Sequence, residues 1–136
     1  MLFRSAIPDT PTPIDAARAL DVLAEPFADF PFAAPHHQSV VLAAILSLLG
    51  RYAVESVPVF AIRATTRGSG KTLLADAISL ISTGRIAPKI PQATDNEEER
   101  KRLLALALDG DPVVLIDNVS GDFGSAALDL AITGQR

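Results

Sequence analysis

The sequence predicts an α/β fold in which helices cover an incomplete parallel sheet in three layers, with a helical segment before the sheet. Two short apolar runs, residues 57–62 and 113–116, are rich in β-branched residues, as strands buried on both faces are. A glycine-rich turn, residues 65–70, follows the first run and leads into helical spacing. This order of strand, turn, helix and strand is typical of the α/β class.

Three segments are predicted along the 136 residues. Residues 1–34 are expected to form an extended arm with a short helix, residues 35–56 a packing helix, and residues 57–136 the part that contains the sheet. Thr12 and Pro13 together make a helix start signal in the first segment. The three phenylalanines that follow this helix are interpreted as hydrophobic plugs: Phe27, Phe30 and Phe32.

The longest apolar stretch lies in a predicted helix over residues 35–52, which we expect neighbours to cover on nearly all sides. His36 and His37 open this helix, and adjacent side chains point about 100° apart on a helix, so we assign no metal to them. The stretch is shorter than the roughly 20 residues of a membrane span. The chain has no cysteine, no signal-peptide pattern and a net charge of −4, so we expect a cytoplasmic protein without membrane contact or a global basic field.

The second half of the chain alternates helical and extended patterns. A helix is predicted from Lys71 to a stop at Gly84, and residues 85–91 are expected to form at most a short edge strand. A capping box of Thr94 and Glu97 predicts the start of an amphipathic helix. Its expected i, i+4 charge pairs are Glu97 with Lys101 and Glu98 with Arg102, and its expected inward side chains are Leu103, Leu104, Ala107 and Leu108.

The glycine-rich turn has the composition of a phosphate-binding loop. A triphosphate carries about four negative charges, which backbone N–H groups converging at a helix N-terminus bind favourably. Gly68 and Gly70 permit the unusual backbone angles that this convergence needs. Lys71 is placed to reach the β and γ oxygens, and Thr72 to ligate Mg²⁺. Residues 57–136 are therefore predicted to be a partial P-loop NTPase domain that binds ATP through Thr66, Arg67, Gly68, Ser69, Gly70, Lys71, Thr72 and Leu73.

Asp117 follows the second apolar run, at the edge where open α/β sheets bind ligands. We predict that it holds Mg²⁺ opposite Thr72 and that Lys71, Asp117 and Asn118 are the catalytic residues. Many ATPases have Glu after this Asp; Asn118 cannot take a proton, but its amide can orient the attacking water. Thr65 stands where the usual pattern has Gly or Ala, and a surface role is favoured for the arginines Arg63 and Arg67.

Several motifs occur in a familiar order between Phe30 and Thr133. They are Phe30-Pro31-Phe32, Thr66-Arg67-Gly68-Ser69-Gly70-Lys71-Thr72-Leu73-Leu74-Ala75-Asp76, Thr83-Gly84-Arg85, Glu97-Glu98-Glu99-Arg100-Lys101-Arg102-Leu103 and Ile116-Asp117-Asn118-Val119. This stretch resembles the ATPase region of primase-helicase proteins of prophages and other mobile elements, which look related to superfamily-3-type helicases of the AAA+ class. The resemblance implies a DNA-replication motor that acts on single-stranded DNA as a homo-oligomeric ring, with Lys71, Thr72, Asp117 and Asn118 at its nucleotide site.

The resemblance also implies a sheet order of 5-1-4-3-2, in which a strand and an arginine finger beyond Arg136 complete the motor. We therefore expect the present chain to bind nucleotide poorly and not to unwind DNA by itself. Two alternatives stay open. A P-loop kinase would set the run 113–116 directly beside the run 57–62. A regulatory module would bind nucleotide without turnover, an option that Asn118 supports.

Overall fold

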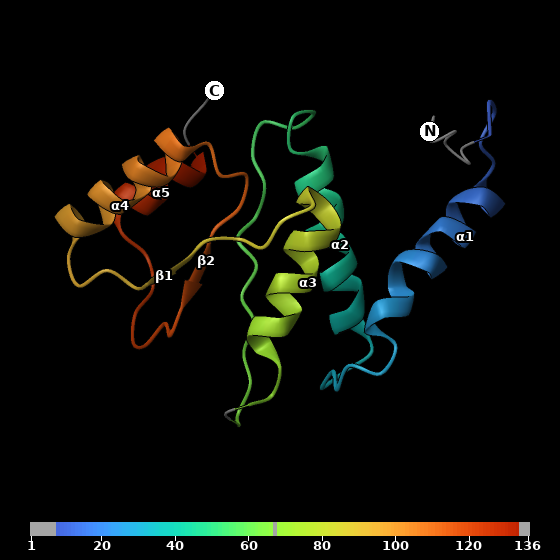
Figure 1. The fold of residues 1–136 in the computed structure, drawn as a ribbon, viewed down its shortest axis with the longest axis horizontal. Helices are drawn as coiled ribbons and strands as arrows, with labels where there is room; N and C mark the ends of the chain where they lie inside the picture. Colours follow the sequence, from blue (N-terminus) through green and yellow to red (C-terminus); the bar gives the residue numbers. More distant parts are fainter. Residues whose placement is uncertain (1–7, 67, 134–136) are drawn as a thin grey trace. The chain divides into compact units, whose positions relative to one another are not determined.

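The computed structural model describes residues 8–66 and 68–133, and the part of the chain that it describes is a mostly helical α/β structure (Figure 1). It contains five α-helices, one 3₁₀ turn and a parallel sheet of two strands. In chain order the elements are α1 (Pro13–Ala24), η1 (Glu25–Phe27), α2 (His36–Gly50), α3 (Lys71–Thr83), β1 (Lys89–Pro91), α4 (Asn96–Asp109), β2 (Leu115–Asp117) and α5 (Ala126–Thr133). The chain divides into two compact units, Met1–Leu42 and Ala43–Arg136.

Helix α1 of the first unit begins where the sequence predicts. Thr12 Oγ1 accepts from the Asp15 amide at 3.3 Å, and the Asp15 carboxylate accepts from the Thr12 amide at 2.9 Å. The Thr12 hydroxyl also donates to the Asp15 carboxylate at 2.6 Å, and this bond first, then the one from the Thr12 amide, holds the pKa of Asp15 below its ordinary value. Phe27 is buried as predicted, and the half-buried rings of Phe30 and Phe32 pack against each other with centroids 5.0 Å apart.

Helix α2 has nearly the predicted bounds, but the expectation that neighbours cover it on all sides is wrong. Its buried side chains are Val41, Ala44 and Ile45, which share one face, whereas its exposed large side chains are Val40, Leu46 and Leu49. The helix is therefore covered along one stripe, and its Ala/Leu-rich composition did not reveal which side that stripe occupies.

The sheet lies in the second unit and joins the strands parallel, with Ile90 opposite Ile116 and Pro91 opposite Asp117. The Leu115 amide extends the ladder by donating to the Pro88 carbonyl at 2.9 Å. The short strand expected within residues 85–91 is confirmed. Both strands run in the same direction, so their carboxyl ends, and the loops that leave them, lie at the same edge of the sheet. Helices α4 and α5 pack side by side (Figure 1).

The predicted strand over residues 57–62 is wrong, because these residues form no strand in the structure. Val59 is 54% exposed, and Pro58 has no N–H with which to enter a ladder. A strand needs a neighbour that supplies hydrogen bonds, and β2 pairs with β1 instead. The described residues accordingly form a two-strand sheet and not the three-layer core that the sequence predicts.

Helix α3 begins at Lys71 and ends at Thr83, and the following Gly84, with a φ of 75°, gives the predicted left-handed stop. Ser79 is buried and its hydroxyl donates to the Arg85 carbonyl at 2.8 Å, which fixes the chain as it leaves the helix. The Lys89 ammonium at the start of β1 lies 2.8 Å from the Asp76 carboxylate of α3. The helix is therefore held to the sheet by a specific polar contact.

Helix α4 starts one residue later than the predicted capping box implies. Asp95 is the N-cap and accepts from the Glu98 amide at 2.8 Å, while the Thr94 amide and hydroxyl donate to the Glu98 carboxylate. Both predicted charge pairs are present. Of the predicted inward side chains, Leu103 is half-buried but Leu104, Ala107 and Leu108 are exposed. The reason is that α5 and the end of β1 cover only one stripe of the helix.

Candidate functional site

The glycine-rich loop reaches α3 through two left-handed residues. Gly68 has φ 75° and Gly70 has φ 84°, backbone conformations that residues with a Cβ rarely adopt. Gly70 is the N-cap of α3, and its carbonyl accepts from the Leu74 amide at 2.8 Å. No side chain caps this helix start and its first turn has no acidic residue. The N–H groups of that turn are thus left for an anion, which the helix dipole attracts.

The side chains at this helix start carry donors without acceptors. The Ser69 hydroxyl is buried and has no hydrogen-bond partner among the described residues. A buried hydroxyl without a partner costs about 1–3 kcal/mol, a cost that a bound oxygen acceptor removes. Lys71 is half-buried and takes part in no ion pair of the described chain, whereas Lys89 and Lys101 each contact a carboxylate at 2.8 Å.

The remaining predicted loop residues lie toward solvent. Thr66 and Thr72 are exposed, and Leu73 is 69% exposed on the outer face of the first turn of α3. The predicted contact of Arg67 falls outside the described residues, and Arg63 is exposed. The hydroxyl of Thr72 is therefore accessible to a metal ion that a bound phosphate brings with it.

Asp117 ends β2 as predicted, and its half-buried carboxylate is oriented by its own chain. Its Oδ1 accepts from the Asn118 amide at 2.8 Å. Asn118 has φ 56° and is the non-glycine residue of the described chain with a positive φ. Asn tolerates this conformation better than most residues, but the strain still identifies a turn that the surrounding structure enforces.

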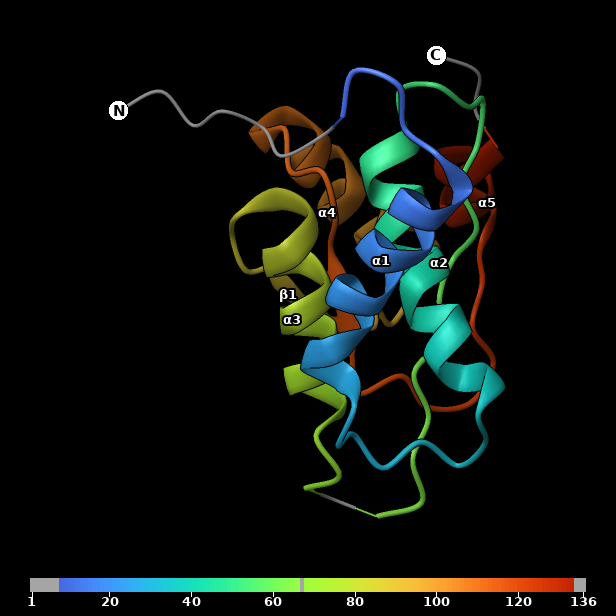
Figure 2. The ribbon, with the colours of Figure 1, turned by 90° about the vertical axis from the view of Figure 1, so that its right-hand side faces the viewer.

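The two halves of the predicted site face the same side of the second unit. In Figures 1 and 2 the loop before α3 and the loop after β2 are both drawn on the lower side of the second unit. No hydrogen bond or ion pair between described residues joins Lys71 or Thr72 to Asp117 or Asn118. Because residues 57–62 lie outside the sheet, no ladder fixes the first loop against β2.

Mg²⁺ suits the side chains that these loops present. It binds proteins through one or two carboxylates together with phosphate oxygens, and keeps several waters. A hydroxyl from Thr72 and a carboxylate from Asp117 match that donor set. No group of three or more His, Cys, Asp or Glu side chains in the described chain could hold a metal by itself. The rings of His36 and His37 instead contact each other edge to face, 4.4 Å apart.

Sequence reasoning did not identify Gln92, the residue that follows β1. Its Oε1 accepts from the Ser120 amide and its Nε2 donates to the Asp122 carbonyl, each at 2.9 Å. Both partners lie in the loop that follows Asp117. The available signal was positional, since a glutamine directly after a parallel strand stands at the ligand-binding edge of the sheet.

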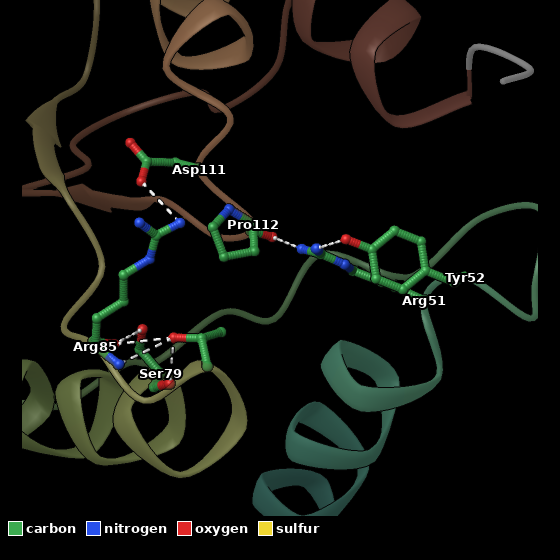
Figure 3. A network of polar contacts seen from close by, with 7 residues as sticks. Arg51, Tyr52, Ser79, Arg85, Asp111 and Pro112 are labelled. Carbon is green, nitrogen blue, oxygen red and sulfur yellow. Dashed lines mark hydrogen bonds and ion pairs between the residues drawn. The ribbon is translucent and has the colours of Figure 1, made fainter.

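A second polar cluster lies at the opposite end of the strands (Figure 3). Arg51 donates to the Pro112 carbonyl at 3.0 Å and stacks on Tyr52, and Arg85 lies 3.7 Å from the Asp111 carboxylate. The cavity beside this cluster has a volume of about 310 Å³. Both guanidinium groups already have acceptors within the protein, so the cluster holds the segment before β2 in place.

No family model, no curated protein and no solved structure matches the chain. Within the described residues no helix is long and apolar enough to cross a membrane.

Proposed function

We propose that this chain is the ATP- and Mg²⁺-binding ATPase module of a DNA-replication helicase or primase-helicase acting in the cytoplasm. The observation that carries the proposal is the start of α3. Two left-handed glycines lead into a helix N-terminus without a side-chain cap, where Lys71 has no carboxylate partner among the described residues. A triphosphate supplies the negative charge and the acceptor oxygens that these groups lack.

Each residue of the site has a distinct task in this proposal. The backbone N–H groups of residues 68–72 bind the phosphates, and Lys71 neutralises charge on the β and γ oxygens. Thr72 and Asp117 hold Mg²⁺, which neutralises the charge that develops on the phosphate oxygens. Asn118 orients the attacking water through its side-chain amide, since positioning supplies most of the catalysis of phosphoryl transfer.

The strand pairing bears on the kinase alternative. That alternative needs residues 57–62 beside β2, whereas β2 pairs with β1 and residues 57–62 are in no ladder. The pairing of β1 with β2 is compatible with the helicase-type order, in which another strand lies between those two segments, whereas the direct neighbour that the kinase alternative needs is not formed by the described residues. Contacts with single-stranded DNA, a homo-oligomeric ring and an arginine finger then belong to a larger assembly around this module. A switch without turnover stays the second candidate, because Asn118 replaces the usual glutamate.

The proposal is tested by measuring the affinity of the chain for ATP with Mg²⁺. Lys71→Ala removes a charge-assisted contact, for which a loss of about 10- to 100-fold in affinity is expected. Lys101→Ala is the matched control, because Lys101 pairs with the exposed Glu97 on α4. Equal affinity of Lys71→Ala and the unaltered chain would falsify the proposal. ATP hydrolysis with and without single-stranded DNA, measured on a longer protein that contains this module and on its Asn118→Ala variant, separates the motor from the switch.

A further inference from the structure

The chain turns sharply out of the sheet after β2, and the side chain of the residue that follows β1 makes hydrogen bonds to the loop formed there. The ladder between the strands stops at the pair of Pro91 with Asp117, because Asn118 at φ 56° turns the chain out of the extended conformation. Gln92 comes directly after Pro91. Its side-chain amide then makes the contacts to the neighbouring chain that the backbone ladder no longer makes.

The two bonds of Gln92 grip the loop on both sides of a turn. Gln92 accepts from the Ser120 amide and donates to the Asp122 carbonyl, and Gly121 between them has φ 71°. A primary amide is the side-chain group that offers a donor and an acceptor side by side, which this pair of contacts requires. Both atoms of the Gln92 amide are thus committed to the loop.

The segment that carries Gln92 is itself held from the other side. The Pro91 carbonyl accepts from Arg102 Nη1 of α4 at 2.7 Å. Arg102 also pairs with Glu98, whose carboxylate accepts from the Thr94 amide at 3.0 Å. The backbone on either side of Gln92 is therefore fixed to α4, so the glutamine can hold the loop in a set position.

From these contacts we propose that Gln92 is a positioning residue for Asp117 and Asn118, an inference that rests on the proposed function. The link is the Asn118 amide, which donates to Asp117 Oδ1 at 2.8 Å. The direction of that N–H depends on the conformation of Asn118, and this conformation depends on where the chain continues to Ser120. By holding Ser120 and Asp122, Gln92 fixes the position of the Asp117 carboxylate, which holds Mg²⁺ in the proposed function, and of the Asn118 side-chain amide, which orients water there.

The test separates metal-dependent from metal-independent binding of ATP. Affinities are measured with Mg²⁺ and with EDTA for the 136-residue chain, Gln92→Ala and Gln92→Glu. Gln92→Ala is expected to weaken binding about 3- to 10-fold with Mg²⁺ and to leave binding in EDTA unchanged. Gln92→Glu keeps the acceptor for Ser120 but turns a carboxylate oxygen toward the Asp122 carbonyl, so it should also weaken binding with Mg²⁺ and leave binding in EDTA unchanged. Gln38→Ala on α2 is the matched control and should change neither affinity.

Amide hydrogen exchange gives a readout that does not depend on nucleotide. Exchange at Ser120 should accelerate in Gln92→Ala and stay unchanged in Gln38→Ala. If Lys71→Ala lowers the affinity for ATP with Mg²⁺ and in EDTA, the proposed function stands. The inference about Gln92 is then overturned if Gln92→Ala changes neither of these affinities or lowers the two equally. If Lys71→Ala lowers neither affinity, the proposed function fails and the inference fails with it.

Discussion

The loop before α3 and the loop after β2 differ in how the protein holds them. In the first, the Ser69 hydroxyl is buried without an acceptor and Lys71 has no carboxylate partner among the described residues. In the second, Gln92 binds the backbone twice and Ser125 caps the following helix by accepting from the Leu128 amide at 3.0 Å. The first loop therefore has interactions left for a ligand, while the second is already fixed by the protein.

This difference assigns the two loops separate parts of the proposed chemistry. Groups without internal partners gain most from a bound phosphate, so most of the binding free energy should come from the first loop. A group that the protein holds in place costs less to order when the reaction begins, so the second loop should affect metal geometry and turnover. Substitutions in the two loops should accordingly change different quantities.

The largest effect is expected from Gly70→Ala in the first loop. Gly70 has φ 84°, and a residue with a Cβ pays about 1–2 kcal/mol to adopt that conformation. The new Cβ also stands at the start of α3, where the phosphates must approach closely. ATP affinity should fall by at least about 10-fold both with Mg²⁺ and in EDTA.

Gly50→Ala is the matched control for this change, since Gly50 ends α2 and a Cβ there would meet nothing within 4 Å. It should leave ATP affinity unchanged and stabilise the fold by up to about 1 kcal/mol, because alanine favours helix. If Gly70→Ala bound ATP as well as Gly50→Ala does, the first loop would not be the phosphate site.

A smaller effect, on stability, is expected at Asn118 in the second loop. Its φ of 56° favours glycine over asparagine and asparagine over alanine. The free energy of unfolding should therefore follow the order Asn118→Gly, unaltered chain, Asn118→Ala, with a total span of about 1–2 kcal/mol. Urea denaturation measures this order. Both variants lose the side-chain amide, so ATP turnover should fall in both whatever their stability.

The opposite stability order would show that the left-handed turn is not imposed by the protein. The second loop would then resemble the first, because its conformation would not be fixed by contacts within the protein. An increase in stability for Asn118→Gly together with a loss of turnover would instead support a strained residue retained for its amide.

Local chemistry made the ends of several elements predictable from the sequence. Thr12 and Gly84 bound their helices where capping rules place them, and α3 begins at Lys71 after Gly70. These features depend on residues a few positions apart, so a pattern in the sequence carries them. Asp117 at the end of β2 was predictable for the same reason, because an apolar run precedes it and a turn follows.

The strand pairing, the covered side of α4 and the contacts of Gln92 could not be predicted, because they depend on residues far apart in the sequence. Residues 57–62 have the composition of a strand, but strand formation needs a neighbour and β2 pairs elsewhere. Leu104 and Leu108 have helical spacing, yet which stripe of α4 is covered is decided by α5. Gln92 reaches Ser120 across 28 positions, a side-chain contact that leaves no local pattern. Local propensity and residue spacing do not predict such long-range contacts.

The smallest predicted effect is a change in the pKa of Glu98, which belongs to the contacts that support the second loop. Hydrogen bonds from the Thr94 amide and hydroxyl, with the charge of Arg102, lower the pKa of the exposed Glu98 carboxyl. A lowered pKa means that this stabilisation is complete above the ordinary glutamate pKa and is lost as pH falls through the lowered value.

Thr94→Ala removes the hydroxyl donor and keeps the amide, so the pKa of Glu98 should rise part of the way to its ordinary value. Carbon-detected NMR titration of Glu98 measures this shift. Since Arg102 connects Glu98 to the Pro91 carbonyl beside Gln92, acid should also lower the protection of the Ser120 amide against exchange, relative to an unstructured peptide at the same pH, before it changes the loop at Gly70. Equal acid sensitivity of both loops would contradict the idea that only the second is held by this network.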